Sequence, residues 1–211
     1  MKKTLRMGML LVLMISLTIV IVEGISRADI ILFQDNFDTE NDGIASLDYN
    51  SFANWYVTAG TVDLIGAGSV WDYYPGHGLY LDLDGSTKKA GILTTKQSFT
   101  FQPNVIYELS FDLGGGIFDV NTVHVSIGSS GPGQIINVRP DDPLVPHVIA
   151  FVFYDAPYTA PIIIYNDGGD NQGAILDNVV LRQIEVPEPA TFFLLGLGLF
   201  GLAGVRRKFK N

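Results

Sequence analysis

Two apolar, uncharged segments stand near the ends of the chain, and they limit where a water-soluble fold can form. Residues 7–22 and residues 190–205 each run for sixteen positions without a charged side chain. Between these ends lie residues 29–186, which are 158 positions. A stretch of this length is enough for one domain with its own hydrophobic core. We therefore expect a single globular domain over residues 29–186.

The N-terminal segment has the parts of an export signal. Three basic residues precede the apolar run, and the small residues Ser26 and Ala28 follow it at the positions that signal peptidase reads. This arrangement predicts a signal peptide over residues 1–28, cleaved by signal peptidase after Ala28, so that the mature chain begins at Asp29. An uncleaved signal anchor is the alternative, and the charged Glu23 directly after the run favours removal.

The C-terminal segment combines a short apolar stretch with a basic end. A helix over residues 190–205 would span about 24 Å, less than the roughly 30 Å of a bilayer's hydrocarbon core. Arg206, Arg207 and Lys208 follow at once and are expected to stay on the cytoplasmic side. The pattern predicts a short transmembrane helix that suits a transient stay in the membrane. A buried core helix with a solvated basic end is the alternative.

The motif Pro187-Glu188-Pro189 stands directly before this helix, and a helix cannot continue through its prolines. Pro-Glu-Pro, a short helix and an arginine-rich end, in that order, resemble the PEP-CTERM sorting signal of bacterial exported proteins. The resemblance implies recognition by the membrane enzyme exosortase, an inner-membrane-anchored precursor, and a final place at the cell surface or in the extracellular matrix. It also implies that residues 187–211 are a sorting tail whose motif residues are Pro187, Glu188, Pro189, Arg206 and Arg207.

The segment between the two ends is strongly acidic. Residues 29–186 hold five Lys and Arg against twenty Asp and Glu, a formal charge of −15, although the whole chain carries −9. Affinity for nucleic acid comes from Lys and Arg that neutralise phosphates, so this composition excludes nucleic acid as a partner. It favours attraction of cations instead. Because the chain has no Cys, disulfides and thiol chemistry are excluded too.

Short β-forming runs separated by Gly, Asn, Asp and Pro fill the acidic segment. Residues 105–113 show a clear alternation: Tyr107, Leu109, Phe111 and Leu113 face one way, and the polar residues between them face the other. Many short strands at this spacing predict an all-β domain, a β-sandwich of the jelly-roll type. The expected strands are residues 30–34, 54–58, 61–65, 79–84, 91–93, 98–102, 105–113, 122–127, 134–138, 147–154, 161–166 and 174–184.

Three short motifs resemble the galactose-binding-like jelly roll that many carbohydrate-binding modules share. They are Phe37-Asp38 soon after the first expected strand, Trp55 at a strand start, and the last strand around residues 175–181. The resemblance implies the jelly-roll fold and a carbohydrate-binding-like module. A shared fold does not imply that this domain shares the activity of those modules.

Catalytic chemistry has little support in the sequence. His77, His124 and His147 show no metal-binding spacing. The Gly-Ser-Ser-Gly at residues 128–131 is not the nucleophile elbow of serine hydrolases. Among twenty acids, a pair of facing carboxylates such as glycosidases use arises by chance. We therefore expect a protein that is not an enzyme, with a glycan hydrolase as the remote alternative.

Asp38 and Asp177 are the candidate ligands of a structural calcium ion, because calcium prefers oxygen ligands. In the jelly-roll modules that this domain resembles, an acid after the first strand and an Asp on the last strand share one ion. Asp38 and Asp177 occupy the matching positions. The alternative is that Asp38 caps a turn and that Asp177 is a solvated strand residue.

An aromatic cluster is the candidate sugar platform. Aromatic faces suit the C–H surfaces of sugars, while nearby carboxylates and amides hold the hydroxyls. The alternative is that Trp71 and Tyr80 are core residues and that the tyrosines between them cover a loop. The candidate platform residues are Trp71, Asp72, Tyr73, Tyr74 and His77.

These features together predict an exported surface or extracellular-matrix protein that is sorted by its tail. Its domain is expected to act as a non-catalytic module that associates with exopolysaccharide in a biofilm. The alternative is a structural or interaction protein of the surface with no specific sugar ligand. An exposed aromatic platform would favour the first interpretation, and complete burial of the aromatic residues the second.

Overall fold

The computed structural model describes residues 29–185. The predicted signal peptide over residues 1–28 and the predicted transmembrane helix over residues 190–205 lie outside the described residues. The regular structure of residues 29–185 consists of strands and one short 3-10 turn, η1 (Glu40–Gly43). Within this part of the chain, no helix is long and apolar enough to cross a membrane.

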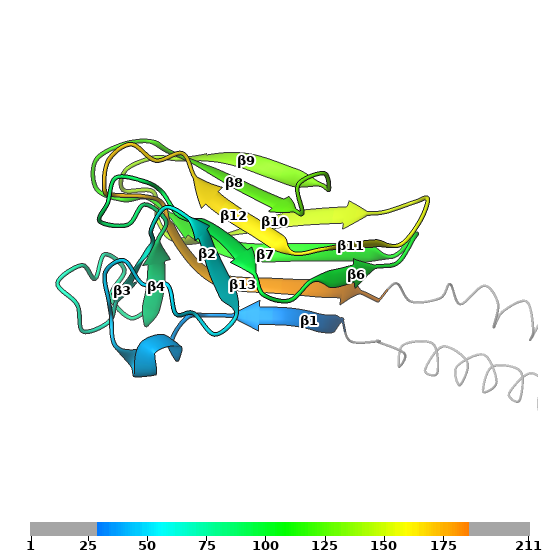
Figure 1. Ribbon diagram of the computed structural model, residues 1–211, viewed down its shortest axis with the longest axis horizontal. Helices are drawn as coiled ribbons and strands as arrows, with labels where there is room; N and C mark the ends of the chain where they lie inside the picture. Colours follow the sequence, from blue (N-terminus) through cyan, green and yellow to red (C-terminus); the bar gives the residue numbers. More distant parts are fainter. Residues whose placement is uncertain (1–28, 186–211) are drawn as a thin grey trace, which may run out of the picture. The chain divides into compact units, whose positions relative to one another are not determined.

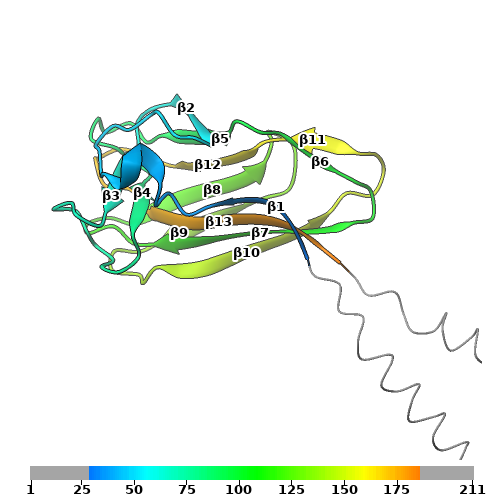
Figure 2. The ribbon, with the colours of Figure 1, turned by 90° about the horizontal axis from the view of Figure 1, so that it is seen from below.

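Two sheets of antiparallel strands pack face to face (Figures 1 and 2). The first sheet has the strand order β10 (Val145–Val152), β7 (Ile106–Gly114), β13 (Ile175–Ile184), β4 (Leu79–Asp82) and β3 (Asp63–Gly66), and β1 (Ile30–Asp35) also pairs with β13. The second sheet has the order β2 (Trp55–Ala59), β5 (Ile92–Thr95), β12 (Ile162–Asn166), β8 (Asn121–Ile127) and β9 (Gly133–Val138). A separate ribbon pairs β6 (Phe99–Phe101) with β11 (Tyr158–Ala160).

The chain passes repeatedly from one sheet to the other. β4 lies in the first sheet and β5 in the second, β7 in the first and β8 in the second, and β12 in the second and β13 in the first. Successive strands therefore often face each other across the core, which is the arrangement of a jelly roll. The predicted all-β sandwich is confirmed.

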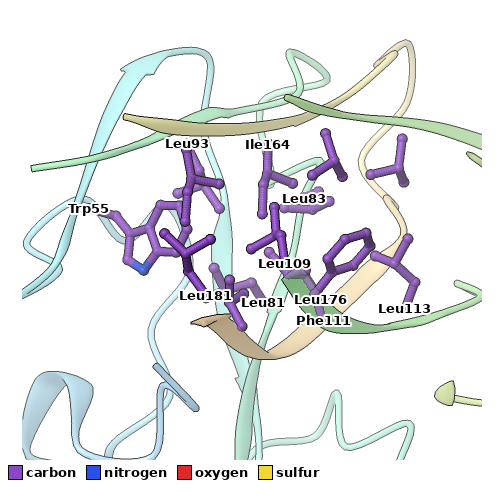
Figure 3. Close-up of a cluster of buried hydrophobic side chains, with 14 of the residues drawn as sticks. Trp55, Leu81, Leu83, Leu93, Leu109, Phe111, Leu113, Ile164, Leu176 and Leu181 are labelled. Carbon is purple, nitrogen blue, oxygen red and sulfur yellow. The ribbon is translucent and has the colours of Figure 1, made fainter. Parts of the chain in front are cut away.

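The core forms where the alternating strands of the two sheets meet. In β7, Tyr107, Leu109 and Phe111 are buried, and the polar residues between them are half-buried. Figure 3 shows Leu109 and Phe111 from the first sheet facing Leu93 and Ile164 from the second. Removal of such apolar side chains from water is the main favourable contribution to folding.

Every expected strand overlaps a strand of the structure, with ends shifted by one or two residues. The strand β11 was not expected, because it has three residues and stands between Pro157 and Pro161. Its pairing with β6 places the hydroxyls of Thr100 and Thr159 in a hydrogen bond of 2.9 Å. This contact joins positions far apart in the sequence, so no local pattern reveals it.

The first and last strands lie side by side, with Ile30 opposite Gln183. The described chain therefore begins and ends at the same end of the sandwich. The β3–β4, β7–β8 and β12–β13 loops gather at the opposite end, on the left of Figure 1. This opposite end is called the loop end below.

Candidate functional site

β3 and β4 form a small corner of the first sheet at the loop end. The two strands pair antiparallel, with Asp63 opposite Asp82 and Ile65 opposite Tyr80. Side chains alternate along a strand, so these four side chains lie on one face of the corner. The intervening Leu64 belongs to the main core on the other face.

The β3–β4 loop folds over the outer face of this corner. Ile65, Tyr80 and Ile175 form a second hydrophobic cluster, and Tyr73 and Tyr74 of the loop pack against it. This packing holds the loop beside the two carboxylates of the corner.

A pocket of about 60 Å³ is formed by the corner, the β3–β4 loop and the β12–β13 loop. A pocket of this size can admit water or a substituent of a larger ligand. Its lining combines aromatic rings, carboxylates and amides. The lining residues are Leu47, Asp63, Ile65, Trp71, Tyr73, Asp82, Ser86, Asn171 and Gln172.

Asp63 is held at the pocket by hydrogen bonds to both of its oxygens. Oδ1 accepts the backbone N–H of Asp48 at 2.6 Å and that of Ser86 at 3.3 Å. Oδ2 accepts the Ser86 hydroxyl at 3.0 Å. Burial raises the pKa of Asp63, and the hydrogen bonds oppose this rise because they stabilise the carboxylate.

Asp82 is only 5% exposed, and one of its oxygens is engaged. Oδ1 accepts the backbone N–H of Asp84 at 3.0 Å and that of Gly173 at 2.6 Å. Burial raises the pKa of Asp82 to about 7, and the neighbouring charges of Asp63 and Asp84 act in the same direction. Within residues 29–185, no Lys or Arg forms a salt bridge with this carboxylate.

Two of the five predicted platform residues line the pocket. Trp71 is 44% exposed, and Tyr73 is half-buried. Burial raises the pKa of the Tyr73 hydroxyl, and the negative charges of Asp82 and Asp63 add to this rise. The ring of Tyr73 therefore stands close to both carboxylates.

The other three platform residues support the loop itself. Asp72 accepts a hydrogen bond from the hydroxyl of buried Tyr80 at 3.0 Å. The Tyr74 hydroxyl lies 2.9 Å and 2.7 Å from backbone carbonyls of the β7–β8 and β9–β10 loops. His77 is exposed, and its ring packs edge-on against Tyr74 at 6.3 Å. None of these three side chains lines the pocket.

Sequence reasoning did not single out Asp63, Asp82 or Gln172 as site residues. One signal was available, since aspartate is rare inside strands and both aspartates fall within expected strands. Their proximity depends on the register of β3 against β4, and Gln172 comes from a loop far along the chain. The pattern of residues in the sequence shows neither relation.

The predicted calcium ligands lie beside β1 and on β13. Asp177 is 1% exposed; burial raises its pKa to about 7, and the charges of Asp112, Asp38 and Asp35 add to the rise. The Asp38 carboxylate accepts a backbone N–H at the start of β4 at 2.9 Å. The Asn178 backbone N–H donates to Asp177 at 2.7 Å. Among residues 29–185, no group of three or more His, Asp or Glu side chains is arranged to hold a metal.

The histidines on strands have partners within the fold. His124 stacks on Tyr165 with ring centroids 4.4 Å apart, and its Nε2 lies 3.1 Å from a carboxylate oxygen of Asp167. His147 stacks on Phe111 at 6.0 Å. Neither histidine lines the pocket.

Several solved structures resemble this domain. The CBM22-1–GH10 modules of the Clostridium thermocellum xylanase Xyn10B align with a TM-score of 0.48 and 10% identity, over 76% of this chain and 30% of that chain. A family 16 carbohydrate-binding module aligns with a TM-score of 0.43 and 18% identity, over 66% of this chain and 100% of that chain.

The CBM22-1–CBM22-2 tandem domain of Paenibacillus barcinonensis Xyn10C aligns with a TM-score of 0.43 and 16% identity, over 79% of this chain and 48% of that chain. This chain therefore spans less than half the length of the two xylanase structures. No curated protein matches the chain in sequence.

The C-terminal end matches the model of one protein family. The family is described as the PEP-CTERM protein-sorting motif, and the match covers residues 185–208. This range includes the Pro-Glu-Pro, the expected helix and both arginines of the predicted tail. The chain carries a PEP-CTERM protein-sorting motif, as its sequence predicted.

Proposed function

We propose that this chain is an exported protein, sorted to the cell surface through its tail, whose β-sandwich binds carbohydrate without cleaving it. The motif at residues 185–208 supports export and sorting. In this account signal peptidase removes residues 1–28, residues 190–205 hold the precursor in the membrane, and exosortase acts on the tail. The mature protein then associates with exopolysaccharide in a biofilm or extracellular matrix.

The exposed Trp71 beside a polar pocket is the observation that carries the carbohydrate proposal. Its side chain is 44% exposed, whereas Trp55, the other tryptophan of the chain, is fully buried. Tyr73 adds a second ring at the same pocket, next to carboxylates and amides. This combination of rigid rings and fixed polar groups suits sugars. Exposure of Trp71 also favours a binding module over a surface protein without a ligand.

The carboxylates at the pocket favour binding over hydrolysis. A glycoside hydrolase places its two carboxyl groups on either side of the bond that breaks. Asp63 and Asp82 instead lie opposite each other on adjacent strands and line the same face of the pocket. Asp63 also has both oxygens engaged by donors of the protein.

A glycan array probed with the full chain in detergent tests this function. We expect retention of at least one class of glycan, and a loss of about tenfold or more in affinity for Trp71→Ala, because the variant removes the stacking surface. The control Tyr154→Ala removes another aromatic side chain, 72% exposed and outside the pocket. Binding of no glycan would favour the structural alternative, and full binding by Trp71→Ala would place the site elsewhere.

We also propose a structural calcium ion between Asp38 and Asp177. Support comes from the buried Asp177, whose carboxylate is influenced by three other aspartates and has no basic partner in a salt bridge among residues 29–185. Calcium takes six to eight oxygen ligands. Since no three acidic side chains among residues 29–185 are arranged to hold a metal, backbone or amide oxygens would have to complete the ligand set.

A further inference from the structure

The pocket beside Trp71 presents acceptor atoms that lack a donor. Asp82 lines the pocket and is 5% exposed, and its Oδ2 accepts no hydrogen bond from residues 29–185. Gln172 lines the same pocket, and its buried Oε1 also has no partner among these residues. An unsatisfied buried acceptor is costly, so the Gln172 oxygen calls for a hydrogen-bond donor. Asp82 Oδ2 is left free to accept from a ligand that enters the pocket.

The same pocket carries negative charge without a positive neighbour. Asp63 lies opposite Asp82, and the lining includes no Lys, Arg or His. The salt bridges found within residues 29–185 involve Arg182 and His124, which lie elsewhere. Two adjacent carboxylates in a poorly solvated site disfavour each other's charge. A donor with a positive charge would therefore satisfy the acceptors and offset this repulsion at once.

The walls of the pocket favour an organic cation over a bare metal ion. Trp71 and Tyr73 line it, and an organic cation is attracted to the face of an aromatic ring. Two carboxylates, Asp63 and Asp82, line the pocket, and both oxygens of Asp63 are already engaged by donors of the protein. A primary ammonium has three donors on one positive centre. It therefore matches an acceptor-rich, negatively charged pocket with aromatic walls.

The size of the pocket indicates which part of a sugar enters it, namely a substituent and not the sugar ring that carries the substituent. A pocket of about 60 Å³ suits a small substituent such as an amino group with its carbon. The sugar ring then lies at the mouth of the pocket, where the exposed Trp71 is available.

We propose that this pocket binds the free amino group of an amino sugar in a polysaccharide, with the sugar ring on Trp71. The inference rests on the proposed carbohydrate-binding function and narrows its ligand to glycans with unacetylated amines. Asp82 and Gln172 accept hydrogen bonds from the ammonium, and Asp63 adds the second negative charge. The domain charge of −15 attracts such a cationic polymer and repels polymers of uronic acids. N-acetylation removes the positive charge and adds bulk, so it abolishes the fit.

Calorimetric titration of the full chain in detergent, with a chelator present, tests the proposal. The probes are the tetramer of β-1,4-linked glucosamine, its fully N-acetylated counterpart and tri-lysine. We expect the glucosamine tetramer to bind at least about tenfold more tightly than either of the others. The N-acetylated tetramer lacks the charged hydrogen-bond donor, and tri-lysine lacks the sugar ring that stacks on Trp71. Equal affinity for tri-lysine would overturn the assignment to a sugar and leave a general cation site.

Asp82→Asn is the decisive variant, since the amide oxygen can still accept the two backbone N–H groups while the charge is gone. We expect it to lose the preference for the free amine, while thermal unfolding in the folded-state control stays cooperative and the melting temperature does not fall. Asp155→Asn makes the same charge change at an exposed position outside the pocket and should keep the preference. If Asp82→Asn keeps it too, the inference is wrong.

The two proposals can fail separately. If both tetramers bind equally and Trp71→Ala abolishes both, the pocket binds sugar but does not select an amine. If neither tetramer binds while another glycan is retained on the array, the amine inference fails and carbohydrate binding stands. If no glycan binds at all, the carbohydrate-binding function fails with it.

Discussion

Asp82 owes its position to a glycine that lies far away in the sequence. The Gly173 N–H donates to Asp82 Oδ1 at 2.6 Å. A Cβ at residue 173 would stand 2.7 Å from the same oxygen, and even closer to the backbone nitrogen of Asp84. Only glycine allows the backbone to approach this carboxylate so closely. One small residue thus fixes which carboxylate oxygen faces the protein and which is left for a ligand.

The free energy of unfolding should fall as the pH rises from about 4 to about 7. Burial raises the pKa of Asp82 and that of Asp177 to about 7, whereas both carboxyls titrate near 4 in the unfolded chain. The folded state therefore binds more protons in this window, so stability is fully present below it and is lost as the pH rises through it. Urea denaturation at pH values on either side of the window measures the effect.

Asp82→Asn should weaken this pH dependence, because the amide does not titrate. The groups that face Asp82 are Asp63, Asp84 and Tyr73, and the first two have pKa values raised by burial as well. Part of the decrease in unfolding free energy with rising pH should therefore persist in the variant. The exposed Asp155→Asn should keep the full pH dependence. If the unfolding free energy of Asp82→Asn depends on pH as strongly as that of the unaltered chain, the raised pKa does not belong to Asp82.

At the level of strands, the alternation of apolar and polar residues determined which strands and which buried faces could be predicted from the sequence. Tyr107, Leu109 and Phe111 occupy every second position, so β7 and its buried face follow from the sequence. Which strands pair with each other depends on how the chain crosses between the two sheets. The local pattern of residues does not show these crossings. Trp71 and Tyr80 illustrate the limit, because both are aromatic and close in sequence, yet Trp71 is 44% exposed and Tyr80 is fully buried.

Leu109→Ala should destabilise the domain by about 2–5 kcal/mol, as expected for a large-to-small change in a packed core. Leu109 is 1% exposed on β7, which pairs with β10 on one side and β13 on the other. Val148→Ala on the adjacent β10 is the control, since that side chain is 52% exposed and should change stability by less than about 0.5 kcal/mol. Denaturant midpoints of the two variants give the comparison.

A calcium ion near β1 and β13 should raise the melting temperature of the domain. Binding to the folded state alone stabilises by about 2.7 kcal/mol at a hundredfold excess over Kd. Chelation should therefore lower the melting temperature, and Asp38→Ala and Asp177→Ala should each abolish most of this response. Monovalent salt at equal ionic strength is the control for general screening. If salt replaces calcium, or if both variants respond in full, the ion does not bind at these residues.

For the molecule as a whole, the two ends of the described chain and the candidate site lie at opposite ends of one sandwich. β1 and β13 pair, so the described chain enters and leaves at one end. The pocket lined by Trp71 is formed in part by the β3–β4 and β12–β13 loops, which lie at the loop end (Figure 1). The described chain therefore ends, at residue 185 where the sorting motif begins, away from the loop end.

Removal of residues 187–211 should leave a folded domain with an unchanged melting temperature. The core is closed by strands between residues 29 and 184, which form one unit of their own. Circular dichroism and thermal unfolding of the truncated chain, beside the full chain in the same detergent, measure the outcome. A loss of cooperative unfolding would mean that the tail contributes to the fold.

Tryptophan fluorescence tests most directly the claim that carbohydrate binds at the pocket beside Trp71. The chain has two tryptophans, and they differ in exposure to solvent. Trp55 is fully buried and Trp71 is 44% exposed, so acrylamide should quench the emission of Trp71 almost alone. A glycan retained by the full chain on the array should protect this emission from quenching, and Trp71→Phe should remove the protected component. If a saturating glycan leaves the quenching of Trp71 unchanged, carbohydrate does not bind at this pocket.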